Sequence, residues 1–328
     1  MSSNQNQLKV FSGKANAGFA EKICNNLFIK PGEIYHHTFP NKESYCQIKE
    51  NVRGCDVFLV SCKGENTNDS LMELLIMADA AKRASAGRLT AVIPYFYYGR
   101  SDRKDKSRVP ISAKLVLDLI EASGINRVVT MDLHSPQVGG FTNLPFDHLT
   151  FEPVLINYIR EKYHNLALRD SVVLMAPDVG AVKRIEKYAT TLKTDFGFIS
   201  KKRVGDDQVE LQSIVGDVKD KNVVIVDDLT ESCGTLIQAA KACKQNGALN
   251  VTCAVTHGAF TSTGLERLIE TTSIDELIHS NTINPVINTR TFVAANENLK
   301  VNQLDVSNLF AKAINSIHNN ESVSELFV

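Results

Sequence analysis

Residues 223–241, VVIVDDLTESCGTLIQAAK, constrain the fold more than any other stretch of the sequence. β-Branched apolar residues open the stretch and predict a strand that is buried on both faces, as in a parallel sheet. Two carboxylates, Asp227 and Asp228, end this strand, and apolar residues from Leu236 to Cys243 then recur at helical spacing. The stretch therefore predicts a strand–loop–helix unit with polar groups at the carboxyl end of the strand, where open α/β sheets bind ligands.

The loop of this unit has the chemistry of a sugar-phosphate site. Its small hydroxylated residues, and the N-terminus of the helix that follows, offer hydroxyl and backbone N–H groups to a phosphate. The two carboxylates would repel a phosphate, but they suit sugar hydroxyls or a Mg²⁺ ion. An ordinary strand–helix turn capped by Ser232 or Thr235 is the alternative. That alternative explains the hydroxyls and leaves the paired acids unexplained.

The fold class predicted from the whole chain is α/β, in two similar domains that are each a mostly parallel sheet flanked by helices. Predicted strands and helices alternate along the sequence, as they do in such sheets. A length of 328 residues suits about two domains of roughly 150 residues each. The alternation restarts near residue 150, so we expect domains at 1–150 and 151–328. The last helix is a candidate for packing back on the first domain.

Composition excludes several classes of protein. A net charge of −1 and a pI near 6.7 argue against a broad nucleic-acid surface. The seven cysteines form no CxxC pair, which favours a reducing compartment over a disulfide framework. The N-terminal residues lack the apolar core of a signal peptide, and no run approaches the ~18 apolar residues of a membrane span. We therefore expect a cytoplasmic protein without a membrane or nucleic-acid partner.

A basic segment follows another predicted strand, at residues 94–112, PYFYYGRSDRKDKSRVPIS. Its cations could hold a polyphosphate, and its aromatic residues could stack on a base. A solvated charged loop is an equally good interpretation. The basic residues are Arg100, Arg103, Lys104, Lys106 and Arg108.

Acidic residues follow two further predicted strands. A second basic segment lies between another two predicted strands. Asp132 and His134 follow one strand and Asp178 another, which suits a metal or an acid–base pair, although a lone histidine is more often structural. Residues 200–207, SKKRVGDD, predict either an exposed hairpin tip or a basic flap that closes over a phosphorylated substrate. The Walker and dinucleotide glycine motifs are absent. Together these segments favour phosphoryl or pyrophosphoryl transfer.

Along essentially its full length, the chain resembles the ribose-phosphate pyrophosphokinases of the phosphate-activated type. The resemblance implies two phosphoribosyltransferase-like halves and a Mg²⁺ cofactor. It also implies transfer of the pyrophosphoryl group of MgATP to the C1 hydroxyl of ribose 5-phosphate, which gives phosphoribosyl pyrophosphate and AMP for nucleotide biosynthesis. Members assemble as dimers that form hexamers, of identical or related chains. The matching segments include FSGKAN, FPNKESYCQIKENVRG, TMDLHSPQ, APDVGAVKR, VGDVKDKNVVIVDD, SCGT and NESVSELF.

The resemblance also implies a role for each candidate site residue. The residues that would bind ATP, the first three from a neighbouring subunit, are Phe39, Asn41, Glu43, Arg100, Arg103 and Lys104. Those of the metal site are His134 and Asp178, and the catalytic flap bases are Lys201 and Arg203. Those that would bind ribose 5-phosphate are Asp227, Asp228, Glu231, Ser232, Cys233, Gly234 and Thr235. Those of an allosteric site, where phosphate activates and ADP inhibits, are Arg53, Arg88 and Ser307; a surface salt bridge and a helix cap are the alternatives.

The chain also departs from the family pattern. Glu231 and Ser232 stand where the family usually has Asp and Thr, and Ser101 stands where it usually has Gln. Because some relatives are regulatory partners with little activity, a low-activity regulatory subunit is the alternative to an enzyme. An ordinary phosphoribosyltransferase is a weaker alternative, since it would leave the basic loop and the basic flap unexplained.

Overall fold

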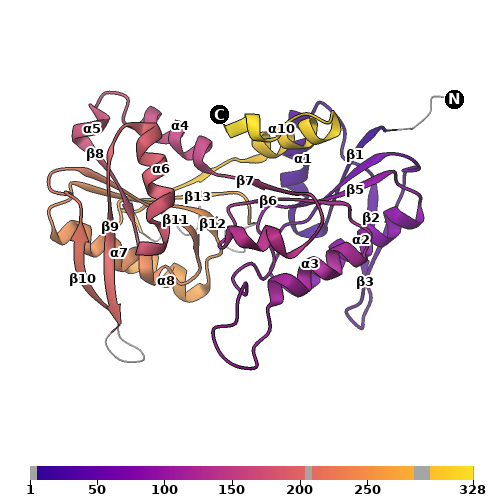
Figure 1. Ribbon diagram of the computed structural model, residues 1–328, viewed down its shortest axis with the longest axis horizontal. Helices are drawn as coiled ribbons and strands as arrows, with labels where there is room; N and C mark the ends of the chain where they lie inside the picture. Colours follow the sequence, from indigo (N-terminus) through magenta and orange to yellow (C-terminus); the bar gives the residue numbers. More distant parts are fainter. Residues whose placement is uncertain (1–5, 204–208, 284–295, 328) are drawn as a thin grey trace. The chain divides into compact units, whose positions relative to one another are not determined.

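The computed structural model describes residues 6–203, 209–283 and 296–327. Within these residues the chain forms two compact units. The first takes in the chain up to Thr150, a short segment from Asn281, and the stretch from Asp305 onward. The second holds Phe151–Ser280 and a stretch that ends at Leu304. Each unit is built on its own sheet (Figure 1).

The described part of the first unit has a five-stranded parallel sheet, in the order β1-β4-β5-β6-β7. Its β4 is buried at every position, because helices cover both faces of a parallel sheet. The strands are β1 (Leu8–Ser12), β4 (Asp56–Val60), β5 (Arg88–Ile93), β6 (Arg127–Met131) and β7 (Phe146–Leu149). The α-helices are α1 (Ala17–Asn26), α2 (Thr67–Arg83), α3 (Ser112–Ala122) and α10 (Ser307–His318), and the 3₁₀ turns are η1 (Lys14–Asn16), η2 (Pro136–Phe141) and η4 (Ser324–Phe327).

The last long helix, α10, packs on α1 within the first unit. Phe19 and Phe310 meet edge to face, with ring centroids 5.6 Å apart. Both rings are buried. Two helices from opposite ends of the sequence therefore pack against each other through apolar side chains.

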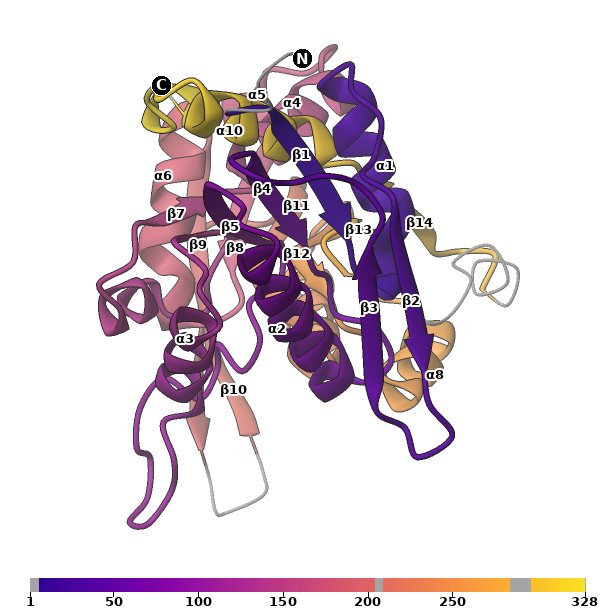
Figure 2. The ribbon, with the colours of Figure 1, turned by 90° about the vertical axis from the view of Figure 1, so that its right-hand side faces the viewer.

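A separate antiparallel hairpin also belongs to the first unit (Figure 2). Its strands are β2 (Ile34–Thr38) and β3 (Ser44–Ile48). Along β2 the side chains alternate between partly buried and exposed positions up to His37, which is the period-two pattern of a half-buried strand.

The described part of the second unit has a seven-stranded sheet, in the order β10-β9-β8-β11-β12-β13-β14. Only the β9–β10 pairing within it is antiparallel. The strands are β8 (Val172–Ala176), β9 (Asp195–Arg203), β10 (Val209–Val215), β11 (Asn222–Thr230), β12 (Asn250–Gly258), β13 (Glu276–Ser280) and β14 (Lys300–Leu304). The helices are α4 (Glu152–Lys162), α5 (Leu168–Ser171), η3 (Val179–Ala181), α6 (Val182–Leu192), α7 (Gly234–Gln245) and α8 (Ser262–Glu270).

These sheets confirm the predicted α/β class. Some individual helices and strands differ from the prediction. The sequence pattern missed β7, α4 and α8, and it ended β11 too early. The strand does not end at Asp227 and Asp228, because pairing with β12 continues as far as Thr230 and Gly258. No described helix is long and apolar enough to span a bilayer.

Candidate functional site

Among the described strands, only β12 pairs with the carboxyl end of β11. Its pairing with β8 ends at Ile225 and Met175, whereas its pairing with β12 continues through Asp227 and Val255 to Thr230. Beyond Ile225, one edge of the strand is therefore released from the ladder between β11 and β8. This geometry places the two acids at the carboxyl edge of a parallel sheet, where such folds bind ligands.

Asp227 and Asp228 form a tight pair, which we name the β11 acid pair. The backbone N–H of Asp228 donates to Oδ1 of Asp227 at 2.9 Å. Asp228 is buried, and Nη1 of Arg184 on α6 lies 3.4 Å from its Oδ1. Burial, and then the neighbouring charge of Asp228, raise the pKa of Asp227 to about 8. Near neutral pH the pair holds a proton, and it becomes a full hydrogen-bond acceptor for sugar hydroxyls once that proton is lost near pH 8.

The loop after β11 leads directly into α7. Cys233 occupies the N-cap position with a left-handed backbone, φ +57°, and its side chain makes no capping hydrogen bond. The alternative, in which Ser232 or Thr235 is the N-cap residue, is therefore wrong. A helix N-terminus without a capping side chain keeps N–H groups for an anion. Both hydroxylated residues are exposed beside it, and Gly234 is the first residue of α7.

Cys233 itself is not a candidate nucleophile. Its side chain is buried, and burial raises the pKa of the thiol to about 11. The thiolate, which is the reactive form of cysteine, is therefore scarce at neutral pH. The side chain instead packs in the core of the second unit.

The predicted basic flap begins on a long antiparallel hairpin of β9 and β10 (Figure 1). Lys201 and Arg203 pair through their backbones with Leu211 and Val209. The central part of the predicted flap, residues 204–208, lies outside the described residues. The hairpin itself was expected from either interpretation of this segment.

The two predicted metal ligands belong to different units. Asp178 is exposed and caps η3, with its Oδ1 accepting from the N–H of Ala181 at 3.3 Å. His134 is also exposed, and it follows β6 and the buried Asp132, whose φ of +36° marks a sharp turn. Among the residues described, no three His, Cys, Asp or Glu side chains gather as a metal cluster. Mg²⁺ commonly takes one or two protein ligands and completes its shell with water and substrate phosphates, so it needs no such cluster.

The basic loop between β5 and α3 keeps its cations exposed, at Arg100, Arg103 and Lys104. The prediction that its aromatic residues stack on a base is wrong for Phe96 and Tyr97. Both rings are buried in the core of the first unit, and the Tyr97 hydroxyl lies 2.6 Å from Oγ of Ser61. An aromatic ring next to a strand end packs inward when the sheet below it is covered.

The tip of the β2–β3 hairpin presents Phe39, Asn41 and Glu43 together, and all three are exposed. The N–H of Phe39 donates to the carbonyl of Glu43 at 2.9 Å, and Oδ1 of Asn41 accepts from the N–H of Glu43 at 3.2 Å. Lys42 turns the chain with φ +73°. The phenyl ring lies edge-on to His37, with centroids 5.0 Å apart.

Comparison with known proteins places the whole chain in one family. The N-terminal domain of ribose phosphate pyrophosphokinase matches residues 8–124, and a phosphoribosyl synthetase-associated domain matches residues 199–328. A ribose-phosphate pyrophosphokinase of Clostridium perfringens is 44% identical over 327 residues, which is 100% of this chain and 99% of that protein. The chain belongs to the ribose-phosphate pyrophosphokinase family. It is thus a member of a family of enzymes.

Further relatives of the family agree. The ribose-phosphate pyrophosphokinase of Caldanaerobacter subterraneus is 43% identical, with 98% of each chain covered. The crystal structure of phosphoribosylpyrophosphate synthetase from Mycobacterium smegmatis matches with a TM-score of 0.86 and 34% identity, covering 96% of this chain and 100% of that one. The resemblance drawn from sequence motifs is confirmed at full length.

The family resemblance implies an allosteric site made of Arg53, Arg88 and Ser307. These three residues differ in their exposure and in their hydrogen-bond partners. Arg53 is exposed. Arg88 donates from Nε to Oδ1 of the fully buried Asp56 at 2.8 Å and from Nη2 to the carbonyl of Ile317 at 2.9 Å. The salt-bridge alternative therefore describes Arg88, although the bridge is buried on its acidic side and not a surface pair.

Ser307, the third of these residues, is also buried. It starts α10, but its own N–H is capped by Oδ1 of Asp305 at 2.8 Å. The serine hydroxyl accepts from Nδ2 of Asn26 at 3.3 Å. The helix-cap alternative is thus wrong for the Ser307 side chain, and the allosteric role of the three residues stays a prediction.

Sequence reasoning missed Arg184 and Arg267. Arg184 lies in the segment APDVGAVKR, which the family resemblance included, but its pairing with Asp228 depends on β8 lying beside β11. Arg267 lies on α8, which the pattern did not predict, and its Nη1 reaches the carbonyl of Ser232 at 3.3 Å. In both cases the partner is distant in sequence, so no local signal marked it.

Proposed function

We propose that this chain transfers the pyrophosphoryl group of MgATP to the C1 hydroxyl of ribose 5-phosphate, giving phosphoribosyl pyrophosphate and AMP. The observation that carries the proposal is the end of β11, where an acid pair with a raised pKa directly precedes a helix N-terminus that has no capping side chain. One group suits sugar hydroxyls and the other suits a phosphate. The names of the full-length relatives support the same reaction.

The residues of the second unit would orient the sugar. The loop over residues 230–235, which we name the phosphate loop, would hold the 5-phosphate with Ser232, Cys233, Gly234 and Thr235. The β11 acid pair would hold ribose hydroxyls, and Glu231 would lie between the two groups in sequence. Fixing the sugar at both ends leaves the C1 hydroxyl free and converts its attack into an oriented, effectively unimolecular step.

In the reaction, the C1 oxygen attacks the β-phosphorus of ATP. The bond from that phosphorus to the α–β bridging oxygen breaks, AMP leaves, and the hydroxyl proton is lost to water. Lys201 and Arg203 would stabilise the negative charge that spreads over the phosphoryl oxygens. Arg100, Arg103 and Lys104 would grip the nucleotide phosphates. Phe39, Asn41 and Glu43 of a neighbouring subunit would hold the adenine.

His134 and Asp178 would hold Mg²⁺, which neutralises phosphate charge when it is bound. Assembly of dimers into a hexamer, with activation by inorganic phosphate and inhibition by ADP, is part of the same proposal and is supported by the family resemblance alone. A cytoplasmic location is also proposed. It is supported by the need for ATP and by seven cysteines that are all buried as free thiols.

An assay of the purified chain alone for AMP release from MgATP tests the proposal. AMP should form only when ribose 5-phosphate is present, in equal amount to phosphoribosyl pyrophosphate. The result that would overturn it is a chain that is inert alone and stimulates a related active subunit, which is the behaviour of a regulatory subunit.

A further inference from the structure

The phosphate loop is held from behind by the segment that joins β12 to α8. The carbonyl of Thr230 accepts from the N–H of Ala259 at 2.9 Å. The carbonyl of Glu231 accepts from both the N–H and the hydroxyl of Thr261, at 3.0 and 3.2 Å. The carbonyl of Ser232 accepts from Arg267 at 3.3 Å. Three successive carbonyls of the loop are therefore bound, two by the segment that joins β12 to α8 and one by α8 itself.

This arrangement fixes the direction of the loop's N–H groups. In a planar trans peptide, the carbonyl of one residue and the N–H of the next point in opposite directions. Because the carbonyls of Glu231 and Ser232 point toward α8, the N–H groups of Ser232 and Cys233 point away from it. Adjacent N–H groups that point to one side form an anion-binding nest, here continuous with the first turn of α7.

The first turn of α8 is packed closely enough to act as a rigid support. A Cβ atom at Gly264 would lie 2.2 Å from the carbonyl oxygen of Glu231, so glycine is required there for this approach. The Thr261 hydroxyl also caps α8 by accepting from the N–H of Gly264 at 3.1 Å. Leu265 and Leu268 anchor the helix in the core of the second unit.

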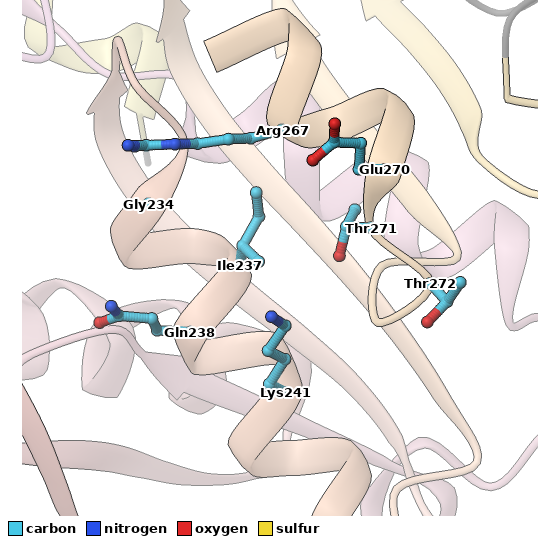
Figure 3. Close-up of a pocket in the computed structure, with 8 residues that line it drawn as sticks. All are labelled: Gly234, Ile237, Gln238, Lys241, Arg267, Glu270, Thr271 and Thr272. Carbon is cyan, nitrogen blue, oxygen red and sulfur yellow. The ribbon is translucent and has the colours of Figure 1, made fainter. Parts of the chain in front are cut away.

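Arg267 extends this support across a surface pocket (Figure 3). The pocket has a volume of about 460 Å³, and α7, α8 and the two threonines after α8 line it. Its other cation is Lys241, two turns further along α7 and so about 10 Å from the start of that helix. Arg267 lies over Gly234, where an added Cβ would meet its Nη1 at 3.3 Å. Arg267 thus touches the phosphate loop, whereas Lys241 lines only the end of the pocket that is far from the loop.

The geometry points to Arg267 as a positioning residue for substrate binding. Its guanidinium ties the Ser232 carbonyl to α8, which holds the nest of N–H groups open for the 5-phosphate before the substrate arrives. Binding to a preset loop loses less conformational freedom than binding to a loop that must still be ordered. This role rests on the proposed function, because it assumes that the phosphate loop binds ribose 5-phosphate.

Arg267→Met, with Lys241→Met as the matched control, tests this role. We expect Arg267→Met to raise KM for ribose 5-phosphate about tenfold, the effect of losing one hydrogen bond from a charged donor. KM for MgATP should stay within about twofold, since the nucleotide does not use this loop. Lys241→Met should leave both constants unchanged, and guanidinium ion added to Arg267→Met should restore part of the lost affinity.

Two results would overturn the proposal: equal effects of Arg267→Met on both KM values, or no difference between the two variants. A second measurement applies even if the wild-type chain releases no AMP, which would be a failure of the proposed function alone. Hydrogen exchange at the N–H groups of Ala259 and Thr261, without ligand, should be several-fold faster in Arg267→Met than in Lys241→Met. Unchanged exchange would show that Arg267 does not hold the loop.

Discussion

Asp227 and Asp305 are the same kind of side chain, yet their pKa values move in opposite directions. Burial and the charge of Asp228 raise the pKa of Asp227 to about 8. Burial alone would also raise the pKa of Asp305, but hydrogen bonds from Lys22, Ser307 and Asn281 lower it to about 2. At the end of β11, Asp227 therefore faces a second carboxyl, whereas Asp305, just before α10, is surrounded by hydrogen-bond donors.

The difference separates an acid that stabilises the fold from one that is held ready for a ligand. Asp305 ties α1, the segment after β13 and α10 together through its donors. Asp227 accepts the backbone N–H of Asp228 and shares a side-chain hydrogen bond with the Asp228 carboxyl, and the ion pair of Arg184 goes to Asp228. A buried carboxyl that faces another carboxyl costs stability when it ionises, and such groups gather where a ligand completes the interactions.

The largest expected effect on activity comes from Asp228→Asn, which removes a charge from the β11 acid pair with little change in shape. We expect kcat/KM for ribose 5-phosphate to fall at least about tenfold, through loss of a charge-assisted hydrogen bond worth about 1.4 kcal/mol. Asp305→Asn is the control and should leave this constant unchanged. Equal kinetics in the Asp228 variant and the wild type would place the sugar elsewhere.

Asp227→Asn should stabilise the ligand-free protein while it weakens function. The folded pKa of Asp227 lies above its ordinary value, so folding binds a proton between the two values and the unfolding free energy falls as pH rises toward about 8. The amide removes this penalty, and we expect a gain of about 2 kcal/mol at pH 8 and little gain near pH 4. Denaturant unfolding at both pH values measures it. A loss of stability at pH 8 would contradict the assignment of Asp227 as an acid whose charged form the fold disfavours.

Asp305→Asn should do the reverse. Its folded pKa lies below the ordinary value, so its contribution is present above pH 4 and disappears as pH falls toward about 2. Because the side chain is partly exposed, we expect a loss of about 1 kcal/mol at pH 7. Denaturant unfolding at pH 7 and pH 2.5 should show the wild type and the variant converging at the lower value. A stability difference that persists unchanged at low pH would argue against these hydrogen bonds as its source.

The smallest expected effect on activity is that of restoring the usual family residues in the phosphate loop. Glu231→Asp with Ser232→Thr keeps one carboxylate and one hydroxyl and shortens the acid by a methylene. We expect AMP release to stay equal or to rise up to about tenfold, within what a small change in position can give. A clear loss of activity would show that the loop is adapted to the longer acid.

The sequence alone predicted the alternation of strands and helices because periodicity and strand-end acids are local signals. It marked Asp227, Asp228 and the loop after them for the same reason. It did not show that β11 continues past the acids, since the continuation depends on pairing with β12. A polar residue inside a strand is indistinguishable from a strand end until its partner strand is known.

The residues that hold the site in place could not be predicted from the sequence for a related reason. The pairing of Arg184 with Asp228 and the bond from Arg267 to Ser232 both join residues from separate elements. Likewise, nothing local to Arg88 showed that its partner Asp56 would be buried. Local patterns identify groups with chemistry, and the order of strands in the sheet decides what those groups touch.

The pH dependence of kcat/KM for ribose 5-phosphate tests the central claim most directly, because this constant reports ionisations of the free enzyme. If the β11 acid pair binds the sugar as a hydrogen-bond acceptor, kcat/KM should rise with pH to an inflection near 8, the pKa of Asp227. Asp227→Asn, which mimics the protonated acid, should stay on the lower plateau without that inflection. A wild-type profile that is flat from pH 7 to 9, or an inflection that survives in Asp227→Asn, would contradict the account.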